Sequence, residues 1–375
     1  MIYLVCSIAL FGFAFLWVAL QKTSAETEWK EAEIFKVSLS ENGGKIFVLA
    51  RGGARGGRAY VFSENKLTWA LPSEFGFSST YKFNGVMAID GSHIAMIARQ
   101  PDYRVFLFKD NEEYPSLATG EIGNEASLNR IALSADGGYI AVSSGDRLYL
   151  FSSKDNEPLW TADVPARSLS ISFDGNHIAV GTENRLLFFS KENSIPLGVA
   201  RISVRSLSIS FDGNYAAVGT DNGFYLFSFG DNEPLWTADV PARDISISSD
   251  GNYIVVNAEN QLLLFSRENG VPLWMAHIDA RSHSICSDGS FIAVGSGDRL
   301  YLFSSGDNEP LWTADVPARS VSISADGNYI VAGGECYFST GAIFKLKFEI
   351  SLFRRFSNVP IWSVKYNDLY YVLPQ

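Results

Sequence analysis

Residues 306–330, with the sequence GDNEPLWTADVPARSVSISADGNYI, decide how this chain folds, because copies of the segment recur along most of its length. Measured on the Asp-Gly pair, the interval between strong copies is 38 residues. Weaker copies centre on Asn42 and Asp90, which brings the number of copies to eight. A fixed period near 40 residues indicates small units that bury their apolar faces only against their neighbours. The strong copies are anchored at Asp136, Asp174, Asp212, Asp250, Asp288 and Asp326.

Each repeat reads as four short strands. In the copy anchored at Asp212, the runs SLSIS (206–210), YAAVG (215–219), FYLFS (224–228) and LWTADV (235–240) are separated by Asp-Gly, Asp-Asn and Asn-Glu-Pro turn signals. Asp-Gly between alternating runs indicates a tight hairpin. Four antiparallel strands at this period are typical of a propeller blade. We therefore predict an all-β fold: an eight-bladed β-propeller over residues 29–375, with a seven-bladed ring, a solenoid and a sandwich as alternatives.

Two residue columns indicate how the blades pack. Before each Asp-Gly pair, large residues alternate with serine, and small serines on one face would let the neighbouring blade pack closely. A tryptophan column on the fourth strand is expected to fill the seams between blades, although Gly198 interrupts it. Alternate copies resemble each other more closely than adjacent ones, which favours duplication of a two-blade unit and an even blade number. The tryptophans are Trp160, Trp236, Trp274 and Trp312.

The sequence leaves the closure of the ring open. Residues 29–34 could supply an outer strand to the last blade, and the tail at residues 358–375 competes for the same position.

Residues 2–20 carry no charge and no proline, and nineteen residues are enough to cross a hydrocarbon core of about 30 Å. We expect residues 1–25 to be either a cleaved signal peptide or an N-terminal membrane anchor; a buried helix of the domain is a third interpretation. Both leading interpretations place the repeats outside the cytoplasmic membrane.

Bulk composition narrows the class of function. Apolar residues make up 47% of the chain and charged residues 19%, so a folded domain is expected. The net charge of -11 argues against a general nucleic-acid binder, which needs a basic surface. Three cysteines do not form a disulfide framework or a zinc motif, and we expect Cys286 and Cys336 to be free thiols. The four histidines fall in repeat columns without a metal-binding spacing.

The segment RLYLFSSGDNEPLW (299–312) resembles the repeat of pyrroloquinoline-quinone-type propellers, and SISFDGNYAAVGTDNGFYLF (208–227) resembles the middle of a WD repeat. The resemblance covers about nine-tenths of the chain and implies the propeller fold. The Gly-His and Trp-Asp signatures of true WD repeats are missing, as is the adjacent cysteine pair of quinone-dependent dehydrogenases. Propellers that resemble this one without those residues are generally binding or assembly scaffolds.

The best candidate site is an arginine column at the first position of the innermost strands. On a propeller, these side chains would surround one mouth of the central channel and could bind carboxylate, phosphate or sulfate groups. In the alternative, Asp163, Asp239 and Asp315, four residues before three of the arginines, pair with them and only stabilise the blades. The column contains Arg167, Arg205, Arg243, Arg281 and Arg319.

Extended loops after the second strand are expected in the eighth, first and second copies, which become neighbours when the ring closes. Binding residues are commonly carried on such loops. For RGGARGGR (51–58) the alternative is an exposed hairpin tip without a ligand. The candidate residues on these loops are Arg51, Arg55, Arg58, Arg99, Tyr103, Arg104 and Tyr337.

The leading hypothesis is a non-enzymatic, extracytoplasmic scaffold, a monomeric ring that binds a protein partner or an anionic surface polymer on the arginine-bearing face. We predict no catalytic residue, metal or cofactor, and a membrane contact through residues 2–20 if they are not cleaved. The alternatives are a propeller enzyme of the quinone-dependent dehydrogenase type and a purely structural cell-surface module.

Overall fold

The structure, a computed structural model, describes residues 32–52, 56–63, 66–71, 84–99, 103–109, 112, 115–120, 122, 130–340 and 343–372. The predicted targeting segment at residues 1–25 lies outside these residues, as do Trp29 and Arg55. Among the described residues, no helix is long and apolar enough to span a membrane.

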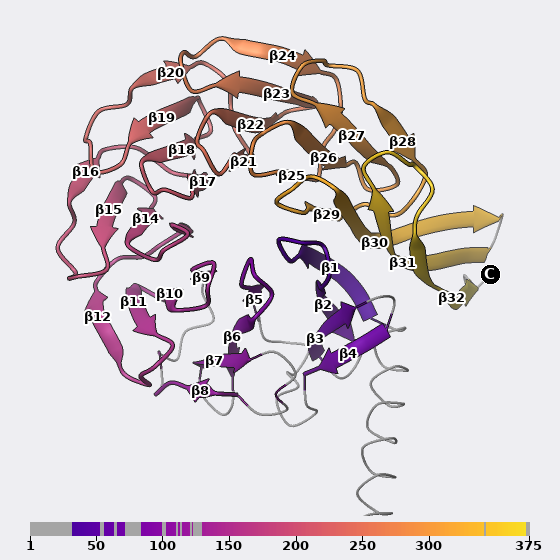
Figure 1. Cartoon of the computed structure of the whole chain (residues 1–375), viewed down its shortest axis with the longest axis horizontal. Coiled ribbons are helices and arrows are strands. Elements are labelled where there is room, and N and C mark those ends of the chain that lie inside the picture. Colours follow the sequence, from indigo (N-terminus) through magenta and orange to yellow (C-terminus); the bar gives the residue numbers. More distant parts are fainter. Residues whose placement is uncertain are drawn as a thin grey trace, which may run out of the picture.

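The described strands form eight four-stranded antiparallel sheets, each built from four strands consecutive in the chain. Figure 1 shows the sheets as blades around a common axis, with the first strand of each blade nearest the centre. The predicted eight-bladed propeller is thus confirmed, and the seven-bladed alternative is wrong.

The first four blades contain, in chain order, β1 (Ala32–Leu39), β2 (Ile46–Gly52), β3 (Gly56–Ser63), β4 (Lys66–Ala70); β5 (Asn84–Met87), β6 (His93–Arg99), β7 (Tyr103–Lys109), β8 (Leu117–Ala118); β9 (Arg130–Leu133), β10 (Tyr139–Ser144), β11 (Arg147–Ser152), β12 (Pro158–Ala162); β13 (Ser168–Ile171), β14 (His177–Gly181), β15 (Leu186–Ser190), β16 (Gly198–Ala200). The last four contain β17 (Ser206–Ile209), β18 (Tyr215–Gly219), β19 (Phe224–Ser228), β20 (Trp236–Ala238); β21 (Asp244–Ile247), β22 (Tyr253–Ala258), β23 (Gln261–Ser266), β24 (Pro272–Ala276); β25 (Ser282–Ile285), β26 (Phe291–Gly295), β27 (Leu300–Ser304), β28 (Trp312–Ala314); β29 (Ser320–Ile323), β30 (Tyr329–Thr340), β31 (Ile343–Arg354), β32 (Trp362–Val372).

The C-terminal tail, not the N-terminal segment, completes the last blade. Its outer strand is β32, which pairs with β31, while Ile34 lies in β1, the innermost strand of the first blade. The ring closes where β1 meets β29: the backbone N–H of Val37 donates to Ser320 Oγ (3.0 Å) and that of Leu39 to Ser322 Oγ (3.1 Å).

The serine column forms hydrogen bonds between blades, a role that the sequence did not predict in addition to close packing. Its hydroxyls accept hydrogen bonds from backbone N–H groups of the next blade, for example Ile209 to Ser170 (3.2 Å) and Val321 to Ser282 (3.2 Å). Since the inner strands of neighbouring blades do not share a ladder, serine satisfies donors that would otherwise be buried without an acceptor.

The Asp-Gly pairs form the predicted tight turns on one face of the ring, here called the turn face. The glycines of all eight copies, including the one after Asn42, have φ between 69° and 73°, a backbone conformation that favours glycine. At Asp212, burial by itself would raise the pKa of the carboxyl, but hydrogen bonds from Ser210 Oγ (2.6 Å) and the Asn214 N–H (3.0 Å) outweigh burial and lower it.

Backbone hydrogen bonds connect these turns from blade to blade into a closed circle. Each bond joins the residue before the Asp-Gly position, or in one case Asp90 itself, to the neighbouring turn. One mouth of the channel is therefore fixed by main-chain contacts. The eight bonds are Glu41 to Ile89, Asp90 to Ala135, Ala135 to Phe173, Phe173 to Phe211, Phe211 to Ser249, Ser249 to Ser287, Ser287 to Ala325 and Ala325 to Glu41.

The tryptophan column fills the seams as predicted. The Trp160 indole stacks on Phe189 of the next blade, and its Nε1 donates to the Lys191 carbonyl (3.0 Å). Trp236, Trp274 and Trp312 donate across their own seams in the same way. A large apolar ring anchored by one hydrogen bond thus recurs from seam to seam.

Candidate functional site

The arginine column lies on the face opposite the turn face. Each arginine comes directly before an inner strand, and in four of the five the backbone N–H donates to a carbonyl at or next to the end of the second strand, as Arg167 does to Gly181 (2.7 Å). The column therefore shares a face with the hairpins that join the second and third strands. We call it the Arg face.

Four arginines of the column form ion pairs with a carboxylate sixteen residues later, on the second hairpin of the same blade. Because the side chains of these arginines are 40–48% exposed, the guanidinium groups remain accessible to solvent. The pairs are Arg167 with Glu183 (3.1 Å), Arg205 with Asp221 (2.5 Å), Arg243 with Glu259 (2.5 Å) and Arg319 with Glu335 (2.7 Å).

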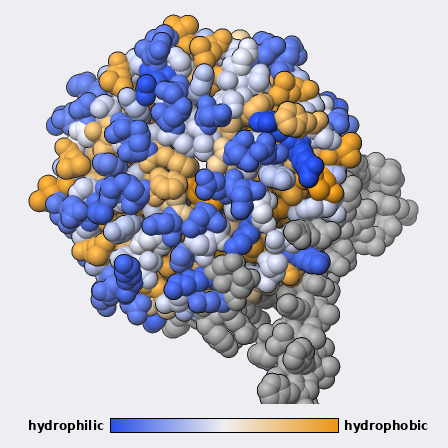
Figure 2. Space-filling model, in the orientation of Figure 1, coloured by the Kyte–Doolittle hydropathy of each residue, from blue (hydrophilic) through white to orange (hydrophobic). Residues whose placement is uncertain are grey.

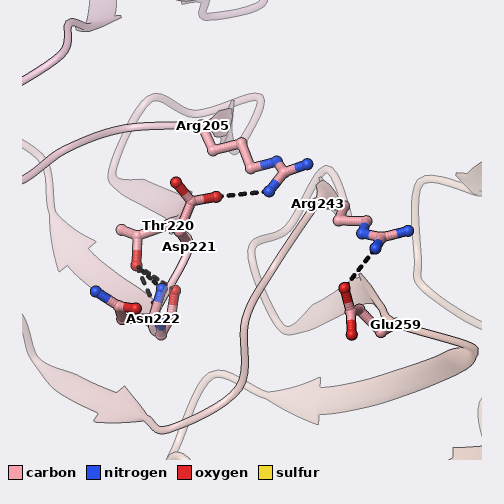
Figure 3. Close-up of polar contacts among 7 residues, drawn as sticks. Arg205, Thr220, Asp221, Asn222, Arg243 and Glu259 are labelled. Carbon is pink, nitrogen blue, oxygen red and sulfur yellow. Dashed lines mark hydrogen bonds and ion pairs between the residues drawn. The ribbon is translucent and has the colours of Figure 1, made fainter.

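Figure 3 shows two of these pairs in adjacent blades and the local structure that positions one of them. The Thr220 hydroxyl accepts hydrogen bonds from the N–H groups of Asn222 (3.2 Å) and Gly223 (2.9 Å), which closes the hairpin around Asp221. The hairpin conformation thus holds the Asp221 carboxylate beneath the Arg205 guanidinium.

The aspartates that were expected to pair with the column arginines do not do so in the structure. Asp163 pairs with Arg147 (3.5 Å) and Asp315 with Arg299 (2.9 Å), so neither pairs with the column arginine four residues after it. No ion pair is recorded for Asp239 within the described part of the chain. Four of the five column arginines are paired, as that alternative expected, but with acids from the second hairpins of their own blades.

The predicted extended loops of blades 8, 1 and 2 are lengthened hairpins rather than irregular loops. In blade 8, β30 and β31 pair from Tyr329 with Arg354 up to Thr340 with Ile343, and Figure 1 shows this yellow sheet projecting beyond the ring. In blades 1 and 2, the ladders continue to Gly52 with Gly56 and to Arg99 with Tyr103. All three hairpins join second and third strands and so belong to the Arg face.

Two loop candidates have described side chains. Tyr103 is 1% exposed and packs in a core cluster with Ile97 and Val105, a position that gives its ring no access to a ligand. Arg104 is half-buried. The backbones of four further candidates lie in the lengthened hairpins, and their side chains are outside the described part; these are Arg51, Arg58, Arg99 and Tyr337.

Lys36 and Asp244, two polar residues that break the serine column of the inner strands, were not identified from the sequence, and His283 was considered there only as a histidine without a metal-binding spacing. Lys36 replaces serine in blade 1, donates to the Gly85 carbonyl of blade 2 (3.2 Å), and has its pKa lowered to about 8 by burial. Asp244 replaces serine in blade 6 and lies 3.7 Å from His283 Nδ1 of blade 7. Burial lowers the pKa of His283 despite the nearby carboxylate, so the imidazole is neutral near pH 7.

Cys286 is a buried free thiol that replaces serine in its turn, where Sγ lies 3.0 Å from Asp288 Oδ1. Burial raises the pKa of this thiol, which makes it a poor nucleophile. The Cys336 side chain is outside the described part. Within the described ranges, no group of three or more His, Cys, Asp or Glu side chains could hold a metal ion.

The side of the molecule that Figure 2 shows is mainly hydrophilic, and its hydrophobic residues form small separate groups, several of them at the outer edge. Some exposed apolar side chains belong to the outer strands, including Leu159 (50% exposed) and Leu273 (51%). A broad apolar docking surface is not visible on this face, so recognition there would rest on polar and charged groups.

Comparison with known proteins supports the fold. The family model described as outer membrane protein assembly factor BamB matches residues 206–348, which is less than half of the chain. BamB from Moraxella catarrhalis has 12% sequence identity and a TM-score of 0.58, with 80% of this chain and 93% of that chain covered. No curated protein matches the sequence.

Two further solved structures are also similar. The C-terminal WD40 domain of Sif2 has 12% identity and a TM-score of 0.63, covering 80% of this chain and 93% of that chain. The propeller domain of Cps50 (Swd1) from Myceliophteria thermophila has 10% identity and a TM-score of 0.52, covering 67% and 91%. These similarities show that the chain has a β-propeller fold, with PQQ-like repeats in the part that matches the family model and WD-repeat-like blades in the similar structures.

Proposed function

We propose that this protein is a non-enzymatic, extracytoplasmic scaffold that binds a protein partner or an anionic surface polymer on its Arg face. The observation that carries the proposal is the clustering of distinctive features on that face. It bears the arginine column and all three lengthened hairpins, whereas the turn face repeats one turn motif around the ring. A rigid scaffold with specialised loops on one side is typical of a binding module.

The location outside the cytoplasm is supported by the uncharged run at residues 2–20 and by the partial match to a family described as an outer membrane protein assembly factor. In that setting, the charged groups on the Arg face would orient the partner and speed its association with the propeller. They would add little affinity, because exposed ion pairs are screened by salt.

Charge reversal tests the proposal. The full chain carrying Arg205→Glu, Arg243→Glu and Arg281→Glu should lose partners that chemical cross-linking captures with the wild type in the source cells. The matched control carries Lys66→Glu, Lys109→Glu and Lys154→Glu, the same change in charge on exposed residues at hairpins of the turn face. If both variants keep every partner, binding does not use the Arg face.

A second measurement addresses the enzymatic alternative. The full chain is titrated with pyrroloquinoline quinone and Ca²⁺ and assayed for dye reduction. Saturable uptake accompanied by dye reduction would contradict the scaffold proposal.

A further inference from the structure

Within the described part of the chain, one arginine of the column has no internal partner. Arg281 of blade 7 has the same position before an inner strand as Arg167, Arg205, Arg243 and Arg319. Sixteen residues later, where the other four blades have Glu or Asp, blade 7 has Gly297. Among the described residues, Arg281 is exposed and makes no side-chain hydrogen bond or ion pair.

The Arg281 guanidinium nevertheless lies against its own hairpin. A Cβ atom built on Gly297 would be 3.3 Å from Arg281 Nε and 3.5 Å from Cζ. Gly297 has φ of 100°, which favours glycine, so the hairpin itself keeps a side chain out of this space. The adjacent Asp298 does not replace the missing acid: its recorded contact is with the Ser296 hydroxyl, at 3.5 Å.

The space beside Arg281 borders the longest hairpin of the Arg face. Gly297 and Ala318 exchange two backbone hydrogen bonds (3.2 and 2.8 Å), which fixes the blade 7 hairpin against the start of blade 8. The next residue, Arg319, donates to Glu335 Oε1 (2.7 Å) near the base of the β30–β31 projection. A partner that contacts this projection would therefore pass close to Arg281.

We propose that Arg281 binds an Asp or Glu carboxylate from an acidic segment of a protein partner, in the position that Glu183, Asp221, Glu259 and Glu335 occupy in their own blades. This inference rests on the proposed function and specifies the chemistry of the partner at one point of the Arg face. The repeat provides the template, because four blades show that a guanidinium at this position binds one carboxylate beside the hairpin.

Binding of a fluorescein-labelled hexaglutamate peptide to the full chain, followed by fluorescence anisotropy at low ionic strength, tests the inference. Arg281→Gln should weaken binding about threefold to fivefold, the upper part of the range expected for one exposed charge pair. Changing residues 296–299 from SGDR to TENR, the blade 4 sequence, should have a similar effect because it supplies an internal glutamate. Arg243→Gln should weaken binding less than Arg281→Gln does, because Glu259 already occupies that guanidinium. The matched control, Lys154→Gln, removes one exposed positive charge from a hairpin of the turn face and should change binding less than about twofold.

A gain-of-function variant completes the test. Glu259→Gln removes an exposed carboxylate and should give Arg243 the properties of Arg281, so peptide affinity should rise about twofold or more, and adding Arg243→Gln should abolish the gain. Equal losses from Arg243→Gln and Arg281→Gln, or no saturable peptide binding, would overturn the inference and leave the cross-linking test of the proposed function unaffected. Arg281-dependent binding of polygalacturonate that is tighter than peptide binding would overturn the choice of a protein occupant.

Discussion

The seam between blades 4 and 5 lacks its tryptophan, and the structure shows what replaces it. In the comparable seam between blades 6 and 7, Trp274 Nε1 donates to the Ser305 carbonyl (3.0 Å). In blades 4 and 5, these two positions are occupied by Gly198 and Phe229. The Phe229 ring lies 4.7 Å from that of Phe188, and the Gly230 carbonyl occupies the space that a Cβ at Gly198 would need. Phe229 therefore fills from blade 5 the space that tryptophan fills from the preceding blade elsewhere.

Phe229→Ser should destabilise the protein by about 2 kcal/mol. Truncation of a fully buried phenylalanine costs about 3–5 kcal/mol, and Phe229 is only half-buried. Gly198→Trp alone should cost about 1–3 kcal/mol through overpacking against the blade 5 turn. The double variant restores the residue pair of the seam between blades 6 and 7, so its loss should be smaller than the sum of the single losses by about 1–3 kcal/mol.

Urea unfolding of the full chain, followed by far-UV circular dichroism, measures these differences as changes in free energy of unfolding. Phe356→Ser serves as a control because Phe356 is 82% exposed, and it should change stability by less than about 0.5 kcal/mol. If the losses of the two single variants add up to that of the double variant within about 0.5 kcal/mol, the side chains do not share one space, and the interpretation of this seam is wrong.

Two further predictions concern the inner strands. His283→Leu should stabilise the protein increasingly as the pH falls below about 6.5, because burial lowers the pKa of His283, so protonation favours the unfolded chain; a difference in melting temperature that is independent of pH between 5 and 8 would contradict this. The double variant Ser320→Ala, Ser322→Ala should lower the free energy of unfolding, measured by urea, by about 2–6 kcal/mol, because the Val37 and Leu39 N–H groups lose their acceptors at the closing seam. An unchanged free energy of unfolding would show that other acceptors replace the serines.

On the Arg face, the arginine column could be predicted from the sequence, but its ion-pair partners could not. The column from Arg167 to Arg319 was visible as a period, and four of its members do share one face and one type of contact. Their partners were not predicted, because the acid nearest to an arginine in the sequence is not its partner in space. Asp163, four residues before Arg167, pairs with Arg147 instead. Glu183 is sixteen residues from Arg167, and only the fold of the second hairpin brings their side chains together.

The sequence by itself determined the four-stranded blade, the number of blades and the positions of the turns, because these features depend on local chemistry repeated at a constant interval. Asp-Gly requires a tight turn whatever surrounds it, and a period of 38 residues with four strands leaves few architectures. Only the tertiary structure decided how the ring closes, that Phe229 compensates for Gly198, and that Arg281 meets no carboxylate among the described residues. Each of these depends on contacts between residues that are distant in the chain, and the repeat pattern shows which residue departs from a column but not which atoms it then meets.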